Sequence, residues 1–114
     1  SEDDDPGLPI FIAGSWTNLQ QLQEMEEYSC TYSFLIELGE TRYETFYFLV
    51  DRSSDMAIYP VAQRGGQRTR VQGPDPFREG QLWAIDGRDA EVPSGTVYRI
   101  QLRWAEMKVV SWEL

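Results

Sequence analysis

The apolar side chains of this chain recur at every second residue over long stretches, and this spacing limits the folds open to it. In residues 30–38, for example, Tyr32, Phe34 and Ile36 share one face, while Thr31 and Ser33 fall on the other. A repeat of two is that of a β-strand with one buried face, whereas a helix repeats every 3.6 residues. The chain is therefore expected to consist of strands, and a helix-rich fold is excluded.

Eight segments carry this pattern between turn residues. We predict strands at residues 8–13, 30–38, 42–50, 56–59, 69–72, 81–86, 96–104 and 108–112. Seven to nine short strands with turn signals about every 8–12 residues predict an all-β fold, an antiparallel sandwich or barrel. Residues 30–38 and 42–50 are expected to pair as a hairpin, and residues 20–27 to form a loop or one helical turn.

The length of 114 residues fits one domain, and 13% aromatic residues suit a β-rich core. We expect residues 8–114 to form a single sandwich domain, with Trp83 and Trp104 in its core and an insert rich in Gly, Pro and Arg at residues 61–80. Residues 1–7 are expected to be a flexible acidic lead that either solubilises the chain or contacts a basic partner. Because the chain does not begin with Met, we expect a processed mature form or a piece of something larger.

The net charge and the residue types that the sequence lacks argue against several classes of function. A net charge of −9 argues against nucleic-acid binding, and no segment approaches the ~20 apolar residues of a membrane span. The chain has no His and a single Cys, so we expect no imidazole catalysis, no metal site and no cofactor. Cys30 is expected to be a buried, inert thiol, and its lack of a pairing partner favours a reducing intracellular or organellar compartment.

Catalysis is not expected from this sequence, and we predict no catalytic residues. A hydrolase that works through two carboxylates stays a third hypothesis, since 19 acidic residues make some Asp/Glu pair inevitable. Such an enzyme would need a cleft with two facing acids.

Two segments of the first half carry a family resemblance. The run Ile-Phe-Ile-Ala-Gly-Ser-Trp-Thr-Asn at residues 10–18 resembles the opening strand and "GSFNNW" turn of starch- and glycogen-binding domains, such as that of AMP-activated protein kinase β subunits. The run Glu-Thr-Phe-Tyr-Phe-Leu-Val-Asp at residues 44–51 is similar to their "YKFxVDG" strand. The resemblance covers residues 8–60. It implies an immunoglobulin-like β-sandwich and a carbohydrate-binding module that binds an α-glucan without catalysis.

The usual sugar-binding positions of that family are not retained. The Trp that closes the family's first turn is replaced by Leu19, although Trp16 lies three residues earlier. Tyr47 stands where the family has a Lys that bonds sugar hydroxyls, and Arg52 replaces the Gly after Asp51. The family's second stacking Trp would fall near Ser53 or Ser54.

A glucose ring needs an exposed aromatic plane to stack on and convergent polar groups for its hydroxyls. A rebuilt site in this chain is therefore expected to use Trp16, Asn18, Tyr47 and Arg52. Trp16 is either such a platform or a plug over the end of the core, and both interpretations stay open. Further candidates are Gln20, Tyr43 and Trp83.

The insert is locally basic in this otherwise acidic chain. It is expected either to be a solvated loop or to dock on an acidic partner surface or a phosphate. Its basic residues are Arg64, Arg68, Arg70 and Arg78. They support the alternative function, a protein-interaction or structural subunit of a larger assembly that keeps the fold and has lost the sugar site.

Overall fold

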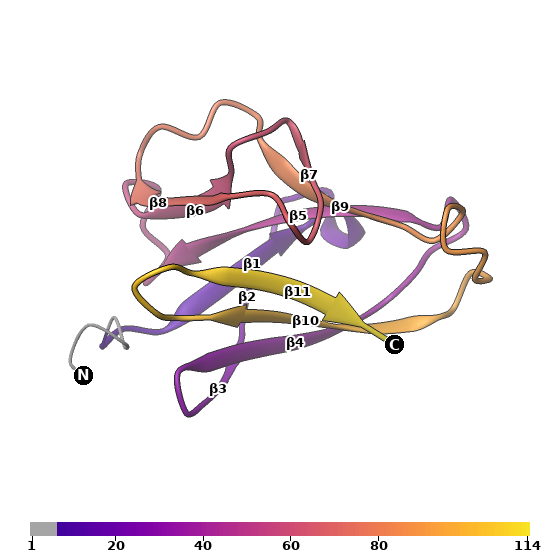
Figure 1. Ribbon diagram of the computed structural model, residues 1–114, viewed down its shortest axis with the longest axis horizontal. Helices are drawn as coiled ribbons and strands as arrows, with labels where there is room; N and C mark the ends of the chain where they lie inside the picture. Colours follow the sequence, from indigo (N-terminus) through magenta and orange to yellow (C-terminus); the bar gives the residue numbers. More distant parts are fainter. Residues whose placement is uncertain (1–6) are drawn as a thin grey trace.

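The computed structural model describes residues 7–114, which form two β-sheets packed face to face (Figure 1). The seven-stranded sheet contains β1 (Ile10–Gly14), β2 (Leu22–Glu24), β5 (Tyr43–Val50), β6 (Ala57–Pro60), β7 (Arg64–Gly65), β8 (Val71–Asp75) and β9 (Leu82–Asp86). The four-stranded sheet contains β3 (Glu26–Tyr28), β4 (Thr31–Glu37), β10 (Val97–Arg103) and β11 (Val109–Glu113). Strand pairs are antiparallel, except that β7 runs parallel to β9.

The all-β, two-sheet sandwich expected from the sequence is confirmed. It has eleven strands rather than seven to nine, because β2, β3 and β7 are only two or three residues long and too short to show alternation. The helical content of the described residues is one 3-10 turn, η2 (Ser15–Thr17), and no helix among them is long and apolar enough to cross a membrane. The predicted acidic lead, apart from Gly7, lies outside the described residues.

Aromatic rings from the seven-stranded sheet fill the space between the layers. Phe46 and Phe48 of β5 and Trp83 of β9 are fully buried. The ring of Phe46 stacks on Trp83 at 5.7 Å between centroids and meets Phe48 edge to face at 5.6 Å. Trp104 is 8% exposed, so both indoles expected in the core lie there. Each fully buried ring of this size stabilises the fold by roughly 2–3 kcal/mol.

The hairpin predicted for residues 30–38 and 42–50 is wrong. The strand β4 pairs with β10 and β3, while β5 pairs with β1, β6 and β9 in the other sheet. The chain crosses between the layers at the turn that ends at Arg42, whose φ is 55°. Because of this crossing, Tyr32 and Ile36 of β4 face Phe46 and Phe48 of β5 across the core. In a hairpin, the two strands would instead lie side by side in one sheet.

Residues 20–27, predicted as a loop or one helical turn, instead contain β2 and the first two residues of β3. Between them Met25 is 4% exposed, and its N–H donates to the Ile10 carbonyl at 2.9 Å. The expectation of a buried Cys30 is also wrong, because its side chain is only half-buried. Ser29 and Cys30 have φ values of 51° and 64°, so the alternation starts at Thr31, after this turn.

Candidate functional site

The four arginines of the insert diverge in the structure. Arg68 and Arg70 line one groove, while Arg64 is exposed on β7 and does not line it. The guanidinium of Arg78 lies 3.8 Å from the centroid of the Tyr47 ring, on the outer face of the seven-stranded sheet. The groove therefore collects half of the predicted docking residues.

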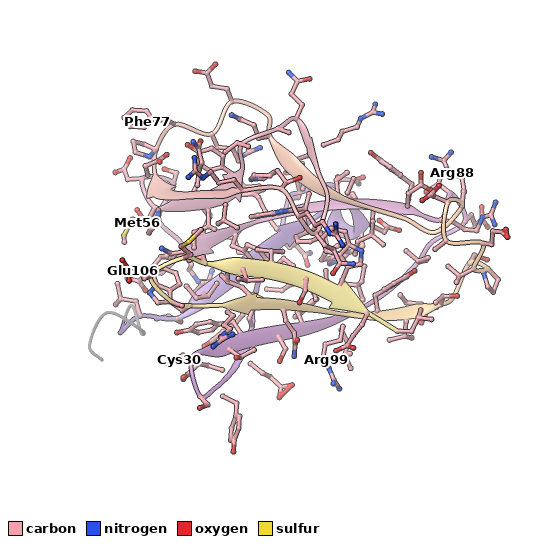
Figure 2. The ribbon with its side chains drawn as sticks, in the orientation of Figure 1. Cys30, Met56, Phe77, Arg88, Arg99 and Glu106 are labelled. Carbon is pink, nitrogen blue, oxygen red and sulfur yellow. The ribbon has the colours of Figure 1, made fainter. Side chains whose placement is uncertain are left out.

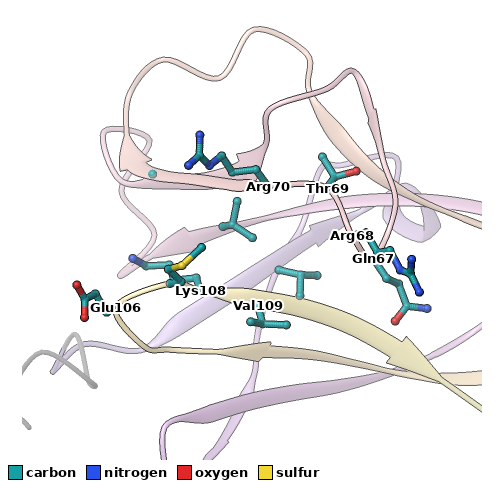
Figure 3. Close-up of a pocket in the computed structure, with 11 residues that line it drawn as sticks. Gln67, Arg68, Thr69, Arg70, Glu106, Lys108 and Val109 are labelled. Atoms are coloured by element: carbon teal, nitrogen blue, oxygen red, sulfur yellow. The ribbon is translucent and has the colours of Figure 1, made fainter.

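A tight turn presents Arg68 and Arg70. The N–H of Thr69 donates to the Gly66 carbonyl at 3.1 Å, and the Thr69 hydroxyl accepts the Gly66 N–H at 2.8 Å. The Arg70 carbonyl accepts the Val61 N–H at 3.0 Å. These three bonds fix the backbone on both sides of Arg68, and β8 then continues from Val71 along the groove (Figure 3).

The hairpin between β10 and β11 forms the opposite wall. Glu106, Met107, Lys108 and Val109 line this side of a hollow of about 550 Å³ (Figure 3). The ammonium of Lys108 lies 4.4 Å from the centroid of the Trp104 ring, and burial lowers the pKa of Lys108. No pattern in the sequence joined this hairpin to the insert, because the two segments are far apart along the chain.

The cations of this groove have no carboxylate partner within the part of the chain that the structure describes. Within residues 7–114 the ion pair is that of Arg88 with Asp86, at 3.2 Å on the far side of the molecule from Glu106 (Figure 2). Arg68, Arg70 and Lys108 thus concentrate unneutralised positive charge in a chain of net charge −9. Glu106 adds one negative charge to the lining, and Val71, Met107 and Val110 supply apolar surface.

The groove runs between two sheet edges. The strand β8 ends the seven-stranded sheet, and β11 ends the four-stranded sheet. At the far end of β11 the N–H of Trp112 donates to the Gln67 side-chain oxygen at 3.0 Å. A side chain of the insert thereby occupies a backbone position that a neighbouring strand would otherwise use.

Trp16 is neither sealed in the core nor an open plane. Its ring is half-buried, stacks on Phe34 at 6.2 Å between centroids and donates its indole N–H to Gln23 at 2.7 Å. The indole also lies directly over Gly14, where a Cβ would stand 2.2 Å from the ring. Asn18, in the left-handed region at φ 55°, is exposed just after η2.

Tyr47 and Arg52 lie on the outer face of the seven-stranded sheet, where arginines cover aromatic rings. Arg78 stands over Tyr47, and the guanidinium of Arg52 lies 4.6 Å from the centroid of the Phe11 ring. Tyr47 packs against Leu49 and borders a hollow of about 290 Å³, whereas Trp16 packs against the inner core. The structure does not bring Trp16 and Tyr47 together on one open face.

The remaining sugar-site candidates are dispersed. Trp83 is fully buried in the core, and Tyr43 carries Arg88 over its ring at 5.4 Å. Gln20 is exposed, and its side-chain amide donates to the Asn18 carbonyl at 3.4 Å.

A second open hollow, of about 530 Å³, covers the outer face of the four-stranded sheet. Tyr28, at 84% exposure, and Leu35, at 58%, supply its apolar surface. Ser33, Arg99 and Gln101 supply polar groups, and Figure 2 shows Arg99 projecting from this side. Sequence reasoning missed Tyr28 because β3 is too short to reveal which face the ring takes.

Comparison of the chain with models of protein families, with curated proteins and with solved structures found no match. Among the described residues, no three Asp, Glu or Cys side chains are grouped so that they could hold a metal ion. The groove between β8 and β11 is the candidate site, because it joins residues predicted to dock a partner to apolar surface and two sheet edges.

Proposed function

We propose that this chain is a non-catalytic interaction module that binds an acidic segment of a partner protein in the groove between β8 and β11. One observation carries the proposal: Arg68, Arg70 and Lys108 line a single groove and have no carboxylate partner among residues 7–114. Charged groups without internal partners are free to pair with a ligand, and the planar guanidinium matches a carboxylate with two parallel hydrogen bonds.

The lining of the groove favours a polypeptide over a bare anion. Its cations alternate with apolar side chains, of which Met107 is 74% exposed and Val109 is 49% exposed. A phosphate alone would leave this apolar surface in water, whereas a peptide with acidic and apolar residues covers both kinds of surface. The Lys108 ammonium is already partly desolvated against Trp104, so pairing with a carboxylate there loses less hydration.

The test uses a capped, fluorescein-labelled octapeptide of alternating glutamate and valine, titrated with the chain in fluorescence anisotropy at low salt. We expect saturable binding that Arg70→Glu weakens about tenfold, since this change replaces attraction by repulsion at the ligand. Arg64→Glu is the matched control: it makes the same change in net charge on the same insert but outside the groove.

Binding should weaken as salt is raised, because part of it is screened charge attraction. Failure of the peptide to bind, or equal loss in Arg64→Glu and Arg70→Glu, would disprove the proposal. Preference for a single-stranded oligothymidylate over the peptide would assign the groove to phosphate instead of protein.

Binding of an α-glucan is a second candidate function, favoured by the hollow over the four-stranded sheet. The ring of Tyr28 is open to solvent there, beside the polar side chains of Ser33, Arg99 and Gln101. An open ring with planar polar groups nearby is the chemistry that a sugar requires.

A glycogen co-pelleting assay tests this second candidate. If the hollow binds glucan, Tyr28→Ala abolishes pelleting while Trp16→Ala and Tyr47→Ala retain it. The reverse pattern would instead support the site predicted from the family resemblance, and no pelleting of the unmodified chain would refute glucan binding at both places.

A further inference from the structure

The edge strand β3 carries acidic and aromatic side chains that are open to solvent. It reads Glu-Glu-Tyr, and all three of its residues are exposed. Neither Glu26 nor Glu27 forms an ion pair within the part of the chain that the structure describes. Tyr28 is 84% exposed, the highest value among the large apolar side chains of that part. Because tyrosine is enriched in protein interfaces, β3 has the composition of a contact segment.

This strand and the groove lie at opposite edges of the four-stranded sheet. The strand order is β11-β10-β4-β3, so two strands separate β3 from β11, which borders the groove (Figure 1). Neighbouring strands are about 4.8 Å apart, which places β3 roughly 14 Å from β11. That separation is beyond the reach of a glutamate side chain. The glutamates of β3 therefore cannot enter the groove of their own chain, but they can enter that of a second copy.

The groove complements β3 in charge and in apolar surface. Alternate residues of a strand point to opposite sides, so an inserted β3 presents Glu26 and Tyr28 to one wall and Glu27 to the other. Both walls carry cations for these carboxylates, and the β10–β11 hairpin adds apolar surface for the ring (Figure 3). The lining residues concerned are Arg68 and Arg70 on the insert, and Met107 and Lys108 on the hairpin.

The contact is one between side chains. Val110 also lines the groove, but it is 2% exposed and belongs to the core, so the backbone of β11 offers no open edge there. In contrast, Arg68 and Arg70 are exposed and Lys108 is half-buried. These cations can pair with carboxylates of another molecule while both sheets keep their own strand pairing.

We propose that β3 of one copy of this chain is the acidic segment that enters the groove between β8 and β11 of a second copy. This inference rests on the proposed function and names the partner. The two surfaces in contact differ, so the interface is heterologous, and a pair of copies still has one free groove and one free β3. The chain is therefore expected to assemble head to tail.

Sedimentation velocity of the full chain over a range of concentrations measures this assembly. About 0.15 M salt screens the repulsion between copies of net charge −9 beyond about 8 Å and weakens contacting pairs less. We expect the average mass to rise with concentration. An edge variant, Glu26→Gln with Glu27→Gln, should weaken association at least about tenfold. A groove variant, Arg68→Gln with Arg70→Gln, should do the same, since it removes charge from the other side of the contact.

Mixing the two variants tests the direction of assembly. The edge variant keeps the native groove and the groove variant keeps the native β3, so the mixture can form one native contact and no second one. We expect a one-to-one heterodimer that does not grow further. The matched control is Glu37→Gln with Glu40→Gln, which removes two exposed carboxylates at the end of β4 away from β3. This control should associate like the unmodified chain.

Assembly that the edge variant leaves unchanged, or the absence of a heterodimer on mixing, would overturn the inference. Assembly that is lost on deletion of residues 1–6 and kept in the edge variant would make that acidic segment the occupant instead of β3. A chain that stays monomeric while the glutamate–valine octapeptide binds, and Arg70→Glu weakens that binding, would overturn self-association and leave the proposed function standing. If neither the octapeptide nor a second copy binds, both are wrong.

Discussion

Glu44 holds Ser15 across the end of the sandwich: one carboxylate oxygen accepts the Ser15 hydroxyl at 2.6 Å. The other oxygen accepts the Gly39 N–H at 3.0 Å, and the Ser15 oxygen in turn accepts the Thr45 N–H at 2.9 Å. Glu44 is 7% exposed, so this carboxylate is buried but satisfied. It links the turn after β1 to the crossing between the two sheets.

Glu44→Gln is expected to destabilise the fold by about 1–3 kcal/mol, because a carboxamide has one acceptor oxygen where the carboxylate has two. Either the Ser15 hydroxyl or the Gly39 N–H would then meet the NH₂ group of the new glutamine instead of an acceptor oxygen. Urea unfolding measures the difference, with the exposed Glu40→Gln as a matched control of the same chemistry. Equal stability of the two variants would show that the network does not hold this end together.

Gly73 is expected to be irreplaceable for steric reasons. Its φ is 98°, and a Cβ would stand 2.0 Å from the Ala57 carbonyl oxygen, which is backbone and cannot move aside. Gly73→Ala should therefore cost at least about 2 kcal/mol in the free energy of unfolding.

Two other glycines separate the causes of that loss. Gly80 has a φ of 95° but open space around it, so Gly80→Ala tests the backbone strain alone, about 1–2 kcal/mol. Gly66 has neither feature, and Gly66→Ala should stay within about 0.5 kcal/mol. A Gly73→Ala variant no less stable than Gly80→Ala would contradict the predicted clash.

Trp83 is fully buried, and its indole N–H finds no acceptor in the part of the chain that the structure describes. Trp83→Phe removes that unsatisfied donor, a gain of about 1–3 kcal/mol that offsets most of the packing lost with the larger ring. We expect a net loss below about 1.5 kcal/mol, against roughly 3–5 kcal/mol for Trp83→Ala. Thermal or urea unfolding compares the two, and a Trp83→Phe loss well above about 1.5 kcal/mol would contradict the unsatisfied N–H.

The faces of the long strands could be predicted from the sequence, but the pairing of strands could not. Alternation in the sequence puts Phe46 and Phe48 on the same face of β5, and both are fully buried. The partner of β4 is β10, in which Val97 lies opposite Glu37, far along the chain. A pattern with a period of two says which residues share a face and nothing about which strand lies beside it.

The candidate site was predictable only in part, for the same reason. Arg68 and Arg70 stood out as a local reversal of charge, and both line the groove. Lys108 and Gln67 gained a role only when the fold brought β11 beside the insert. Trp16 follows a strand in a 3-10 turn, where alternation no longer predicts the face, and it turned toward the inner layer.

Ionisation of Tyr59 is expected to make the free energy of unfolding depend on pH in the alkaline range. Its hydroxyl donates to the Asp75 carboxylate at 2.7 Å, and its ring is 2% exposed on the outer face of the seven-stranded sheet. Burial, then the hydrogen bond to Asp75 and the negative charges of Asp75 and Glu79, raise the pKa of Tyr59 above its ordinary value of 10.0. All of these causes favour the neutral phenol in the folded state.

The sign of the pH dependence follows from the raised pKa. Well below pH 10.0 the phenol is protonated in both states, so its contribution to stability is complete and constant. Above that pH the unfolded chain loses the proton first, and the contribution falls until pH passes the raised pKa of the folded state. Urea unfolding between pH 7 and 12 should show a stability difference between the unmodified chain and Tyr59→Phe that is flat at first and then shrinks.

Tyr28→Phe is the matched control for this experiment. It removes the same hydroxyl group from a tyrosine that is 84% exposed instead of buried. Its stability difference from the unmodified chain gives the effect of removing a hydroxyl group that is open to solvent. Asp75→Asn removes a negative charge beside Tyr59, and the alkaline fall should then end at a lower pH, because the pKa of Tyr59 in the folded state is less raised. A Tyr59→Phe difference that stays constant through pH 12, or an Asp75→Asn curve that coincides with the parent, would mean that the Tyr59–Asp75 bond does not control the ionisation of this phenol.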